Sequence, residues 1–171
     1  MTDKLVIALA QLNPTVGKIG ANLEKLREMR KKAAEEGADL ILTSELYTCG
    51  YPPEDLVRKP QFISSLRSAV EAFASETSDG GPAVLLGTPW VESNRLHNSL
   101  VLIEGGAITT ARNKYDLPNY GVFDEKRVFD PGPMPGPISF KDVRIGVPIC
   151  EDIWTPEVVE CITETGGEII L

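Results

Sequence analysis

Histidine and cysteine are scarce: the 171 residues include one histidine, His97, and three cysteines, Cys49, Cys150 and Cys161. A single imidazole excludes any metal site that needs two histidines. The cysteines are odd in number, widely spaced and form no Cys-x-x-Cys pair, so neither a disulfide framework nor a structural zinc site is expected. We therefore expect free thiols and no bound metal, as in a protein of the reducing cytoplasm.

Long hydrophobic runs and an excess of positive charge are also missing. No apolar stretch approaches ~18 residues, so no transmembrane helix is expected, and the start, Met-Thr-Asp-Lys, lacks a signal-peptide pattern. The formal net charge of −8 argues against a general affinity for nucleic acid or an anionic membrane. With 42% hydrophobic and 25% charged residues, the chain has the composition of one globular domain.

Short apolar runs separated by amphipathic stretches predict an α/β fold. The run from Leu5 to Ala10 predicts a central strand, and Asn22 is placed to cap the helix that follows. Gly37 ends that helix, before a second apolar strand from Asp39 to Thr43. Strand, helix and strand in this order predict parallel pairing through a right-handed crossover.

The rest of the chain continues this alternation. Residues 46–60 and 113–137 are rich in proline and are expected to be ordered loops, while Gly105-Gly106 suits a two-residue hairpin turn. The other predicted elements are a helix from Gln61 to Ser78, a strand from Ala83 to Gly87, hairpin strands from Leu96 to Glu104 and from Ala107 to Arg112, a strand from Val143 to Ile149, a helix from Pro156 to Thr165 and a strand from Glu168 to Leu171. Nothing follows this last apolar strand to cover it, so we expect residues 1–171 to be part of a longer protein.

Three reactive side chains follow predicted strands: Glu45, Lys114 and Cys150. The carboxyl ends of strands in an open α/β sheet are where loops gather into a site. Lys114 would favour the thiolate of Cys150 by charge, or Glu45 would remove the thiol proton during attack on an amide carbonyl. The Lys114 ammonium and a backbone N–H just after Cys150 are candidate donors to the resulting oxyanion. Together these groups predict a covalent hydrolase.

Each residue also fits a structural role when it is taken alone. A cysteine at the end of an apolar strand is commonly a small core residue, Glu45 suits a helix cap or a solvated carboxylate, and Lys114 suits a surface charge. His97 offers a Cys/His dyad with Cys150, although its polar neighbours favour a position on the rim of the site. Cys49 and Cys161 are expected to be structural.

Three segments resemble one family in order along the chain. Residues 44–56 (SELYTCGYPPEDL), 114–127 (KYDLPNYGVFDEKR) and 150–154 (CEDIW) are similar to the glutamate, lysine and nucleophile motifs of the nitrilase, or carbon–nitrogen hydrolase, superfamily. The branch that they resemble is the glutaminase domain of glutamine-dependent NAD synthetases. The resemblance implies a four-layer αββα sandwich that is incomplete at its C-terminus, with residues 1–171 as a truncated glutaminase domain.

The resemblance also implies a role for each matching residue. Cys150 would form a thioester with glutamine, Glu45 would be general base and acid, and Lys114 would stabilise the tetrahedral intermediate. Substrate-binding positions would be Tyr51, Tyr120, Glu125 and Glu151, although ordinary loop packing also accounts for the tyrosines.

The partners implied by the resemblance are glutamine and a synthetase domain of the same protein, which would receive the ammonia, with assembly into a homo-oligomer. This domain would need no cofactor, while ATP and Mg²⁺ would serve the full-length synthetase. The synthetase domain is absent from this chain, which has no Ser-Gly-Gly-x-Asp-Ser sequence, and the 171 residues alone are not certain to be active. Two other functions stay open: a freestanding amidase or carbamoyl hydrolase with the same triad, and a non-catalytic module for binding or oligomerisation.

Overall fold

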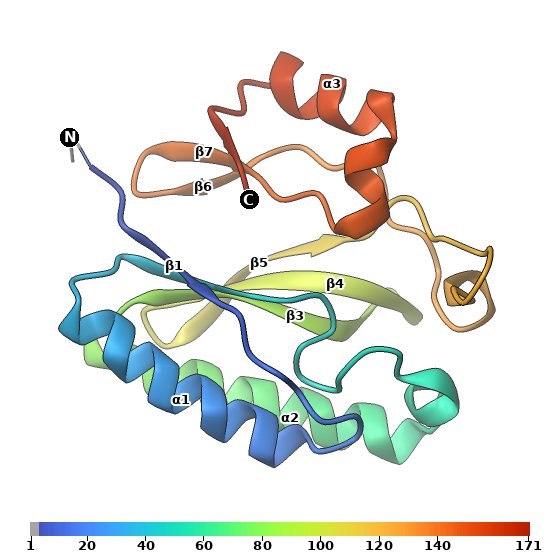
Figure 1. Ribbon diagram of the computed structural model, residues 1–171, viewed down its shortest axis with the longest axis horizontal. Helices are drawn as coiled ribbons and strands as arrows, with labels where there is room; N and C mark the ends of the chain where they lie inside the picture. Colours follow the sequence, from blue (N-terminus) through green and yellow to red (C-terminus); the bar gives the residue numbers. More distant parts are fainter. Residues whose placement is uncertain (1–3) are drawn as a thin grey trace.

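Four layers make up the computed structural model, which describes residues 4–171 (Figure 1). Residues 1–3, which belong to the start examined for a signal peptide, lie outside the described part. Two helices cover one face of a five-stranded sheet, a three-stranded sheet packs on its other face, and a short helix closes the far side. The predicted αββα order is confirmed. No helix in residues 4–171 is long and apolar enough to cross a membrane.

The first sheet has the strand order β1-β2-β3-β4-β5. Its first three strands are parallel, as predicted for the first pair, and β4 and β5 continue antiparallel. The bounds of its elements are β1 Ile7–Ala10, α1 Ile19–Glu35, β2 Leu40–Thr43, α2 Pro60–Glu76, β3 Ala83–Glu92, β4 Arg95–Glu104 and β5 Ala107–Asn113. The predicted hairpin turn at Gly105-Gly106 is confirmed, since both glycines have positive φ and join β4 to β5.

Alternation along the buried strand β3 separates two cores. Val84 and Leu86 belong to the cluster beneath the helices, together with Leu26 of α1 and Phe73 of α2. Leu85 faces the other way, into a cluster shared with the second sheet. Successive side chains of a strand point to opposite faces, so one apolar run serves both interfaces.

The second sheet has the order β6-β7-β8, with bounds Ile138–Phe140, Val143–Gly146 and Ile169–Ile170. Strand β6 was not predicted, and β7 ends at Gly146 instead of Ile149. Helix α3, Pro156–Glu164, packs over Gly146, where an added Cβ would lie 2.5 Å from Ile162. The last strand, predicted to be apolar and without a covering element, has Ile169 and Ile170 36% and 43% exposed.

Asn22 does not cap a helix, contrary to the sequence prediction. Helix α1 begins at Ile19, so Asn22 lies inside its first turn and is completely buried. Its side chain accepts a hydrogen bond from the backbone of Thr15 and donates to the carbonyls of Thr15 and Thr48. The residue therefore joins the start of α1 to the segment that follows β2.

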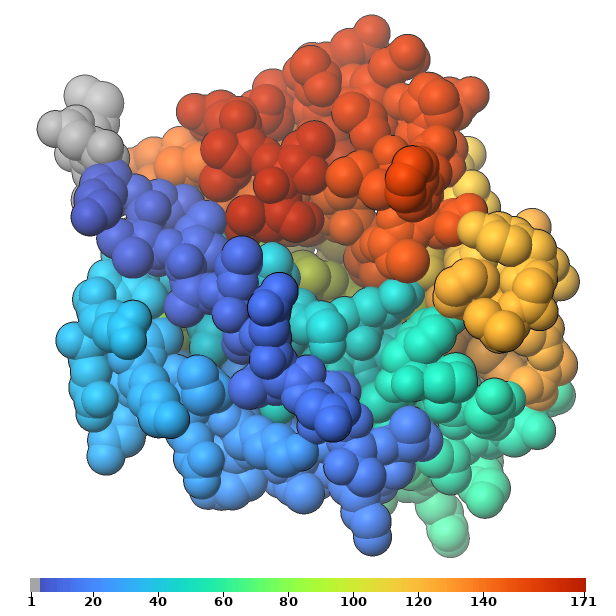
Figure 2. Space-filling view, viewed as in Figure 1, coloured from blue at the N-terminus to red at the C-terminus, as the bar shows by residue number. Residues whose placement is uncertain are grey.

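Both proline-rich connections are ordered by contacts with each other. Arg127, in the short 3-10 helix η3 (Glu125–Arg127), forms ion pairs with Glu54 and Asp55 of a second one, η1 (Glu54–Arg58). In Figure 2 the gold surface of residues near 120 lies between the turquoise of the earlier connection and the orange-red C-terminal elements. Two further 3-10 helices, η2 (Thr77–Asp79) and η4 (Cys150–Trp154), complete the described structure.

Candidate active site

Glu45 follows β2 in a turn that runs against the neighbouring strand β3. Gly87 of β3 permits this contact, because a Cβ at that position would lie 2.2 Å from the carbonyl oxygen of Ser44. The hydroxyl of Thr43 accepts a hydrogen bond from the Gly87 backbone N–H at 3.0 Å, and the Gly87 carbonyl accepts one from Thr48 at 3.1 Å. The close contact at Gly87 therefore determines the position of the turn that carries Glu45.

Lys114 follows β5 and its side chain is fully buried. Its Nζ donates to Oε1 of Glu45 at 2.7 Å and to both carboxylate oxygens of Glu125 at 3.0 Å. The backbone N–H of Gly132 donates a hydrogen bond to the carbonyl oxygen of Lys114, with 2.7 Å between nitrogen and oxygen. A lysine in this position is not the surface charge that the sequence alone left open.

Asn98 of β4 completes a network that we call the charged cluster, formed by Glu45, Asn98, Lys114 and Glu125. The Asn98 side-chain Nδ2 donates to Glu45 at 2.7 Å and to Glu125 at 3.2 Å. Tyr51 donates its hydroxyl hydrogen to Glu125 at 3.0 Å. Both carboxylates are thus held from several directions, and Glu125 is only 4% exposed.

Burial and charge oppose each other in the pKa values of this cluster. Burial by itself would lower the pKa of Lys114, but the charges and hydrogen bonds of Glu45 and Glu125 outweigh it and raise that pKa. Burial raises the pKa of Glu125, the charge of Glu45 raises it further, and Lys114 and Asn98 only partly offset this. The ammonium is therefore a stable cation that faces two carboxylates.

Cys150 begins η4 at the end of the second sheet, with a φ of 49° in the left-handed region. It shares with Glu45 a cavity of about 160 Å³, which is also lined by Gly87 and Pro148. Part of Cys150 is exposed, yet the partial burial of its thiol raises its pKa, and the charge of Glu45 raises it further against the opposing charge of Lys114. Of the two modes of activation that the sequence left open, this environment favours a protonated thiol beside a carboxylate placed to accept its proton.

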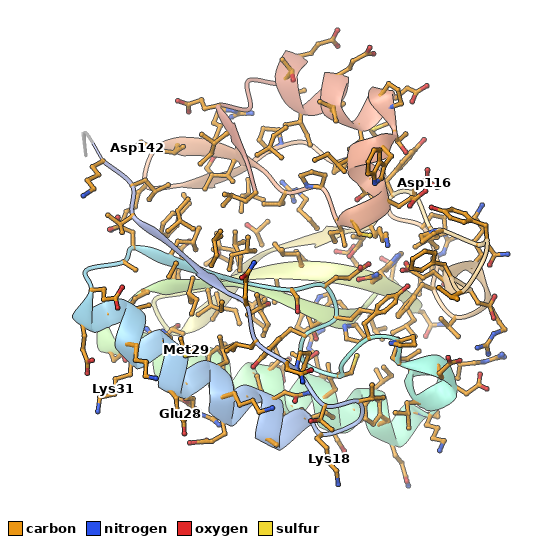
Figure 3. The ribbon with its side chains drawn as sticks, in the orientation of Figure 1. Lys18, Glu28, Met29, Lys31, Asp116 and Asp142 are labelled. Atoms are coloured by element: carbon orange, nitrogen blue, oxygen red, sulfur yellow. The ribbon has the colours of Figure 1, made fainter. Side chains whose placement is uncertain are left out.

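Asp152 connects the nucleophile segment to the lysine segment. Its Oδ1 accepts hydrogen bonds from the backbone N–H groups of Tyr115 at 3.0 Å and Asp116 at 2.7 Å. Its Oδ2 accepts one from Ile149 at 3.0 Å, and the residue is 1% exposed. Figure 3 shows Asp116 beside the red ribbon of η4 and α3.

Tyr120 and Glu151 pair with each other at the surface. The hydroxyl of Tyr120 lies 3.0 Å from both carboxylate oxygens of Glu151, and Tyr120 is 59% exposed. Neither residue lines the cavity that Glu45 and Cys150 share, and neither do Tyr51 and Glu125. Their assignment to substrate binding stays a prediction.

His97 occupies neither of the positions considered for it. It is buried, so the rim position is wrong, and its Nδ1 is 2.8 Å from the carbonyl oxygen of Asp130. Its neighbour Asn98 faces the charged cluster, so alternation along β4 turns the imidazole away from Cys150. Cys49 is completely buried, as expected for a structural thiol, and this burial raises its pKa to about 12. Cys161 lies on α3 and is partly exposed, so its structural role stays a prediction.

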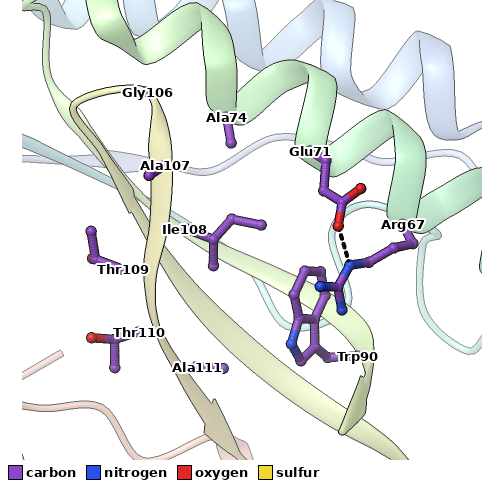
Figure 4. A pocket seen from close by; sticks show the side chains of 10 residues that line it. All are labelled: Arg67, Glu71, Ala74, Trp90, Gly106, Ala107, Ile108, Thr109, Thr110 and Ala111. Carbon is purple, nitrogen blue, oxygen red and sulfur yellow. Dashed lines mark hydrogen bonds and ion pairs between the residues drawn. The ribbon is translucent and has the colours of Figure 1, made fainter.

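Other cavities lack this chemistry. One of about 460 Å³ lies between α2 and the edge strand β5, where Arg67 bonds Glu71 and stacks 3.7 Å from the ring centroid of Trp90 (Figure 4). It contains no cysteine. In residues 4–171, no three side chains of His, Cys, Asp or Glu are placed to hold a metal ion. Among the cavities described in residues 4–171, the one shared by Glu45 and Cys150 is equipped for nucleophilic catalysis: a thiol and a proton acceptor line it, and the buried ammonium of Lys114 is bonded to Glu45.

Asn98 and Asp152 were missed as site residues in the sequence. Asn98 lies among polar residues that suggested a rim, and only its alternation with His97 hinted that it faces inward. Asp152 lies two residues after Cys150, inside a quoted motif, but two of its three partners, Tyr115 and Asp116, are 37 and 36 positions away. Hydrogen bonds over such separations leave no local pattern.

Comparison with known proteins gives one consistent family. The sequence pattern of the Carbon-nitrogen hydrolase family matches residues 6–171. The glutamine-dependent NAD(+) synthetase of Rhodobacter capsulatus is 39% identical over all of this chain, which covers 31% of that protein. Its counterpart from Synechocystis is 45% identical over 88% of this chain and 28% of its own length. The chain thus spans less than a third of the curated relatives it matches.

Solved structures agree with this result. The glutamine-dependent NAD+ synthetase of Acinetobacter baumannii, in complex with ADP, superposes with a TM-score of 0.89 at 34% identity, over 96% of this chain and 31% of that one. A mutant of the amidase from Nesterenkonia sp. AN1 gives a TM-score of 0.82 at 26% identity, over 98% of this chain and 65% of that one. That amidase structure shows the product of Michael addition of acrylamide at the active-site cysteine.

Proposed function

This chain belongs to the carbon–nitrogen hydrolase family, and we propose that it is the glutamine-hydrolysing part of a glutamine-dependent NAD(+) synthetase. Two observations support this choice of branch. The synthetases from Rhodobacter capsulatus and Synechocystis align with the chain at 39% and 45% identity, and the Acinetobacter baumannii synthetase shares its fold with a TM-score of 0.89. Each is matched over about the same fraction of its length, as expected for one shared domain.

The first half-reaction would transfer the glutamyl group to Cys150. The thiol sulfur attacks the side-chain amide carbon of glutamine while Glu45 takes its proton. Within residues 4–171, Lys114 and Asn98 each donate a hydrogen bond to Oε1 of Glu45. The other carboxylate oxygen, Oε2, is therefore the one that would accept the thiol proton. The ammonium of Lys114 and the backbone N–H after Cys150 stabilise the oxyanion. Glu45 then protonates the amide nitrogen, the C–N bond breaks and ammonia leaves.

The second half-reaction would regenerate the enzyme. Water attacks the thioester carbon while Glu45 takes a proton from it, the C–S bond breaks, and the sulfur recovers its proton from Glu45. Glutamate is the second product. One carboxylate thus serves both half-reactions, which is consistent with a buried His97 that does not take part.

The wider assembly follows from the same proposal. Ammonia would pass to a synthetase domain of the same protein, where ATP adenylates deamido-NAD and ammonia displaces AMP to give NAD. ATP and Mg²⁺ would act there, and the glutaminase domain would use no cofactor. We further propose a homo-oligomer in the cytoplasm, a reducing compartment that suits three free cysteines.

The observation that carries this proposal is the cavity in which Glu45 and Cys150 meet beside the buried ammonium of Lys114. The test is intact-mass analysis and peptide mapping after the intact protein is incubated with a glutamine analogue that bears an electrophile at the side-chain carbonyl position. We expect a single adduct on Cys150 that free glutamine prevents. An intact protein without any adduct on Cys150 would refute the glutaminase assignment.

Two alternatives give different results in the same experiment. A freestanding amidase, which the Nesterenkonia amidase structure makes the nearest alternative, would be protected by small amides and not by glutamine. A non-catalytic module would show equal alkylation of Cys150 and Cys161 by a general reagent. Hydrolysis assays with glutamine and with acetamide separate the first alternative directly.

A further inference from the structure

The lysine loop and the nucleophile turn come from different sheets. We define the lysine loop as residues 114–116, after β5 of the five-stranded sheet, and the nucleophile turn as residues 149–154, after β7 of the three-stranded sheet. Lys114 can stabilise an oxyanion on a carbonyl attacked by Cys150 only if these two segments keep a fixed separation. Effective positioning needs tolerances well below about 1 Å.

We infer that Asp152 is a positioning residue, whose buried carboxylate latches the lysine loop to the nucleophile turn and so sets the distance between Lys114 and Cys150. This inference rests on the function proposed above. Asp152 accepts hydrogen bonds from the backbone of Tyr115 and Asp116, the two residues that come directly after Lys114. It accepts a third from Ile149, the residue directly before Cys150. It acts through these backbone groups and has no assigned contact with substrate.

The chemistry of this position calls for a carboxylate. Three backbone N–H groups need acceptors, and the two oxygens of Asp152 supply them in a site that is 1% exposed. Burial raises the pKa of Asp152, and the three backbone hydrogen bonds and the charge of Lys114, which favour the ionised form, offset this only in part. An amide of the same shape has one acceptor oxygen and one NH₂ donor, so it would leave either the lysine loop or Ile149 without its partner.

Two side-chain contacts made by residues next to these segments, Thr155 and Tyr120, are more exposed. The Thr155 hydroxyl donates to Asp116 at 2.8 Å in a partly buried position, and Tyr120 bonds Glu151 at the surface. Within the charged cluster, Glu45, Asn98, Lys114 and Glu125 hold one another without a hydrogen bond to Ile149 or Asp152. In the described part of the chain, Asp152 is therefore the buried side chain that hydrogen-bonds both the lysine loop and the nucleophile turn.

The test is Asp152→Asn in the intact protein, with Asp142→Asn as the matched control at an exposed turn labelled in Figure 3. We expect kcat for glutamine hydrolysis to fall ~10- to 100-fold with KM changed much less, because misplaced groups lose transition-state stabilisation. The pH at which Cys150 reaches half-maximal alkylation by iodoacetamide should shift, because the thiol then lies at a different distance from the Lys114 ammonium. The control should leave both readouts unchanged.

Several outcomes would overturn the inference. Wild-type kcat and an unshifted alkylation profile in Asp152→Asn would do so, as would a variant that loses thermal stability but keeps its kcat/KM when folded. If Asp152→Asn fails to fold, Asp152→Glu supplies the same readouts with the carboxylate kept but displaced, and unchanged values there would count equally against it. If the wild type does not hydrolyse glutamine, the proposed function fails, while the alkylation profile still decides the role of Asp152.

Discussion

Nζ of Lys114 lies 2.7 Å from Oε1 of Glu45, and the lysine side chain has no exposure to solvent. A second carboxylate, Glu125, takes two further hydrogen bonds from the same ammonium at 3.0 Å. Removing one partner of a buried ion pair is costly because the other charge is left uncompensated. This relationship makes Lys114 important both to the proposed chemistry and to the state of its neighbours.

Replacement of Lys114 by alanine should abolish most glutamine-dependent activity of the intact enzyme. Loss of an oxyanion donor typically lowers kcat by ~10²–10³-fold. NAD formation from added ammonia should persist, because that reaction would not use this site. Lys31→Ala, at an exposed position on α1 labelled in Figure 3, is the control. Loss of both activities in Lys114→Ala would instead indicate a damaged fold.

The reactivity of Cys150 should depend on Glu45 with a definite sign. Burial and the negative charge of Glu45 both raise the pKa of the thiol, so removal of that charge in Glu45→Gln should lower it. The pH of half-maximal alkylation of Cys150 by iodoacetamide should therefore move downward in the variant, although glutamine hydrolysis is lost with the base. Glu71→Gln, on the exposed side of α2, should leave the profile in place. An upward shift would show that Glu45 does not face the thiol.

Gly87→Ala tests the close approach between β3 and the Glu45 turn. The added methyl group would lie 2.2 Å from the Ser44 carbonyl and 2.9 Å from the Leu46 nitrogen, both backbone atoms, so the turn must move. A displacement near 1 Å at a catalytic group can cost about 100-fold in rate, and we expect a loss of that order in glutamine hydrolysis. Gly20→Ala is the control, since nothing lies within 4 Å of its added Cβ on α1. Equal activity of the two variants would contradict the role assigned to Gly87.

Asn98→Asp adds a third carboxylate to the charged cluster. Like charges raise the pKa of the carboxyl groups in the folded state above their unfolded values. A carboxyl group with a raised pKa lowers the free energy of unfolding at neutral pH. This lost stability returns as the pH falls through the pKa values of the carboxyl groups and they become protonated. The melting temperature of the variant should therefore lie below that of the wild type at neutral pH, and the difference should shrink as the pH is lowered. The control Asn94→Asp, in the exposed β3–β4 turn, should show no such trend. A difference independent of pH would argue against charge repulsion as the cause.

Local patterns in the sequence predicted most of the scaffold. The apolar runs that became β1 and β2, the helical spacing of α2 and the Gly105-Gly106 turn all act over a few residues, and all four were predicted. Strand β6 was missed because Ile138-Ser139-Phe140 is too short to show alternation after a proline-rich stretch. The start of α1 was placed at Asn22 because that residue suits a helix cap, whereas its tertiary contacts with Thr15 and Thr48 determine its position.

The candidate site was predictable in its residue types and less so in its connections. Glu45, Lys114 and Cys150 stood out because each follows a strand. The hydrogen bonds of Asn98 to Glu45 and of Asp152 to the lysine loop depend on how two sheets pack, and nothing in the local sequence encodes that packing. The raised pKa of Cys150 likewise arises from burial and from Glu45, 105 positions earlier in the chain.

The charged cluster contains two carboxylates, Glu45 and Glu125, and one ammonium, Lys114. Under the proposed function, glutamine would enter the site beside this cluster with a neutral side-chain amide, and hydrolysis would turn that amide into a carboxylate at the same place. Two like charges at close range repel, and they do so more strongly in a partly dry cavity than in water. The negative charge that, together with burial, raises the pKa of Cys150 would therefore also repel the glutamate formed by the proposed reaction and favour its release.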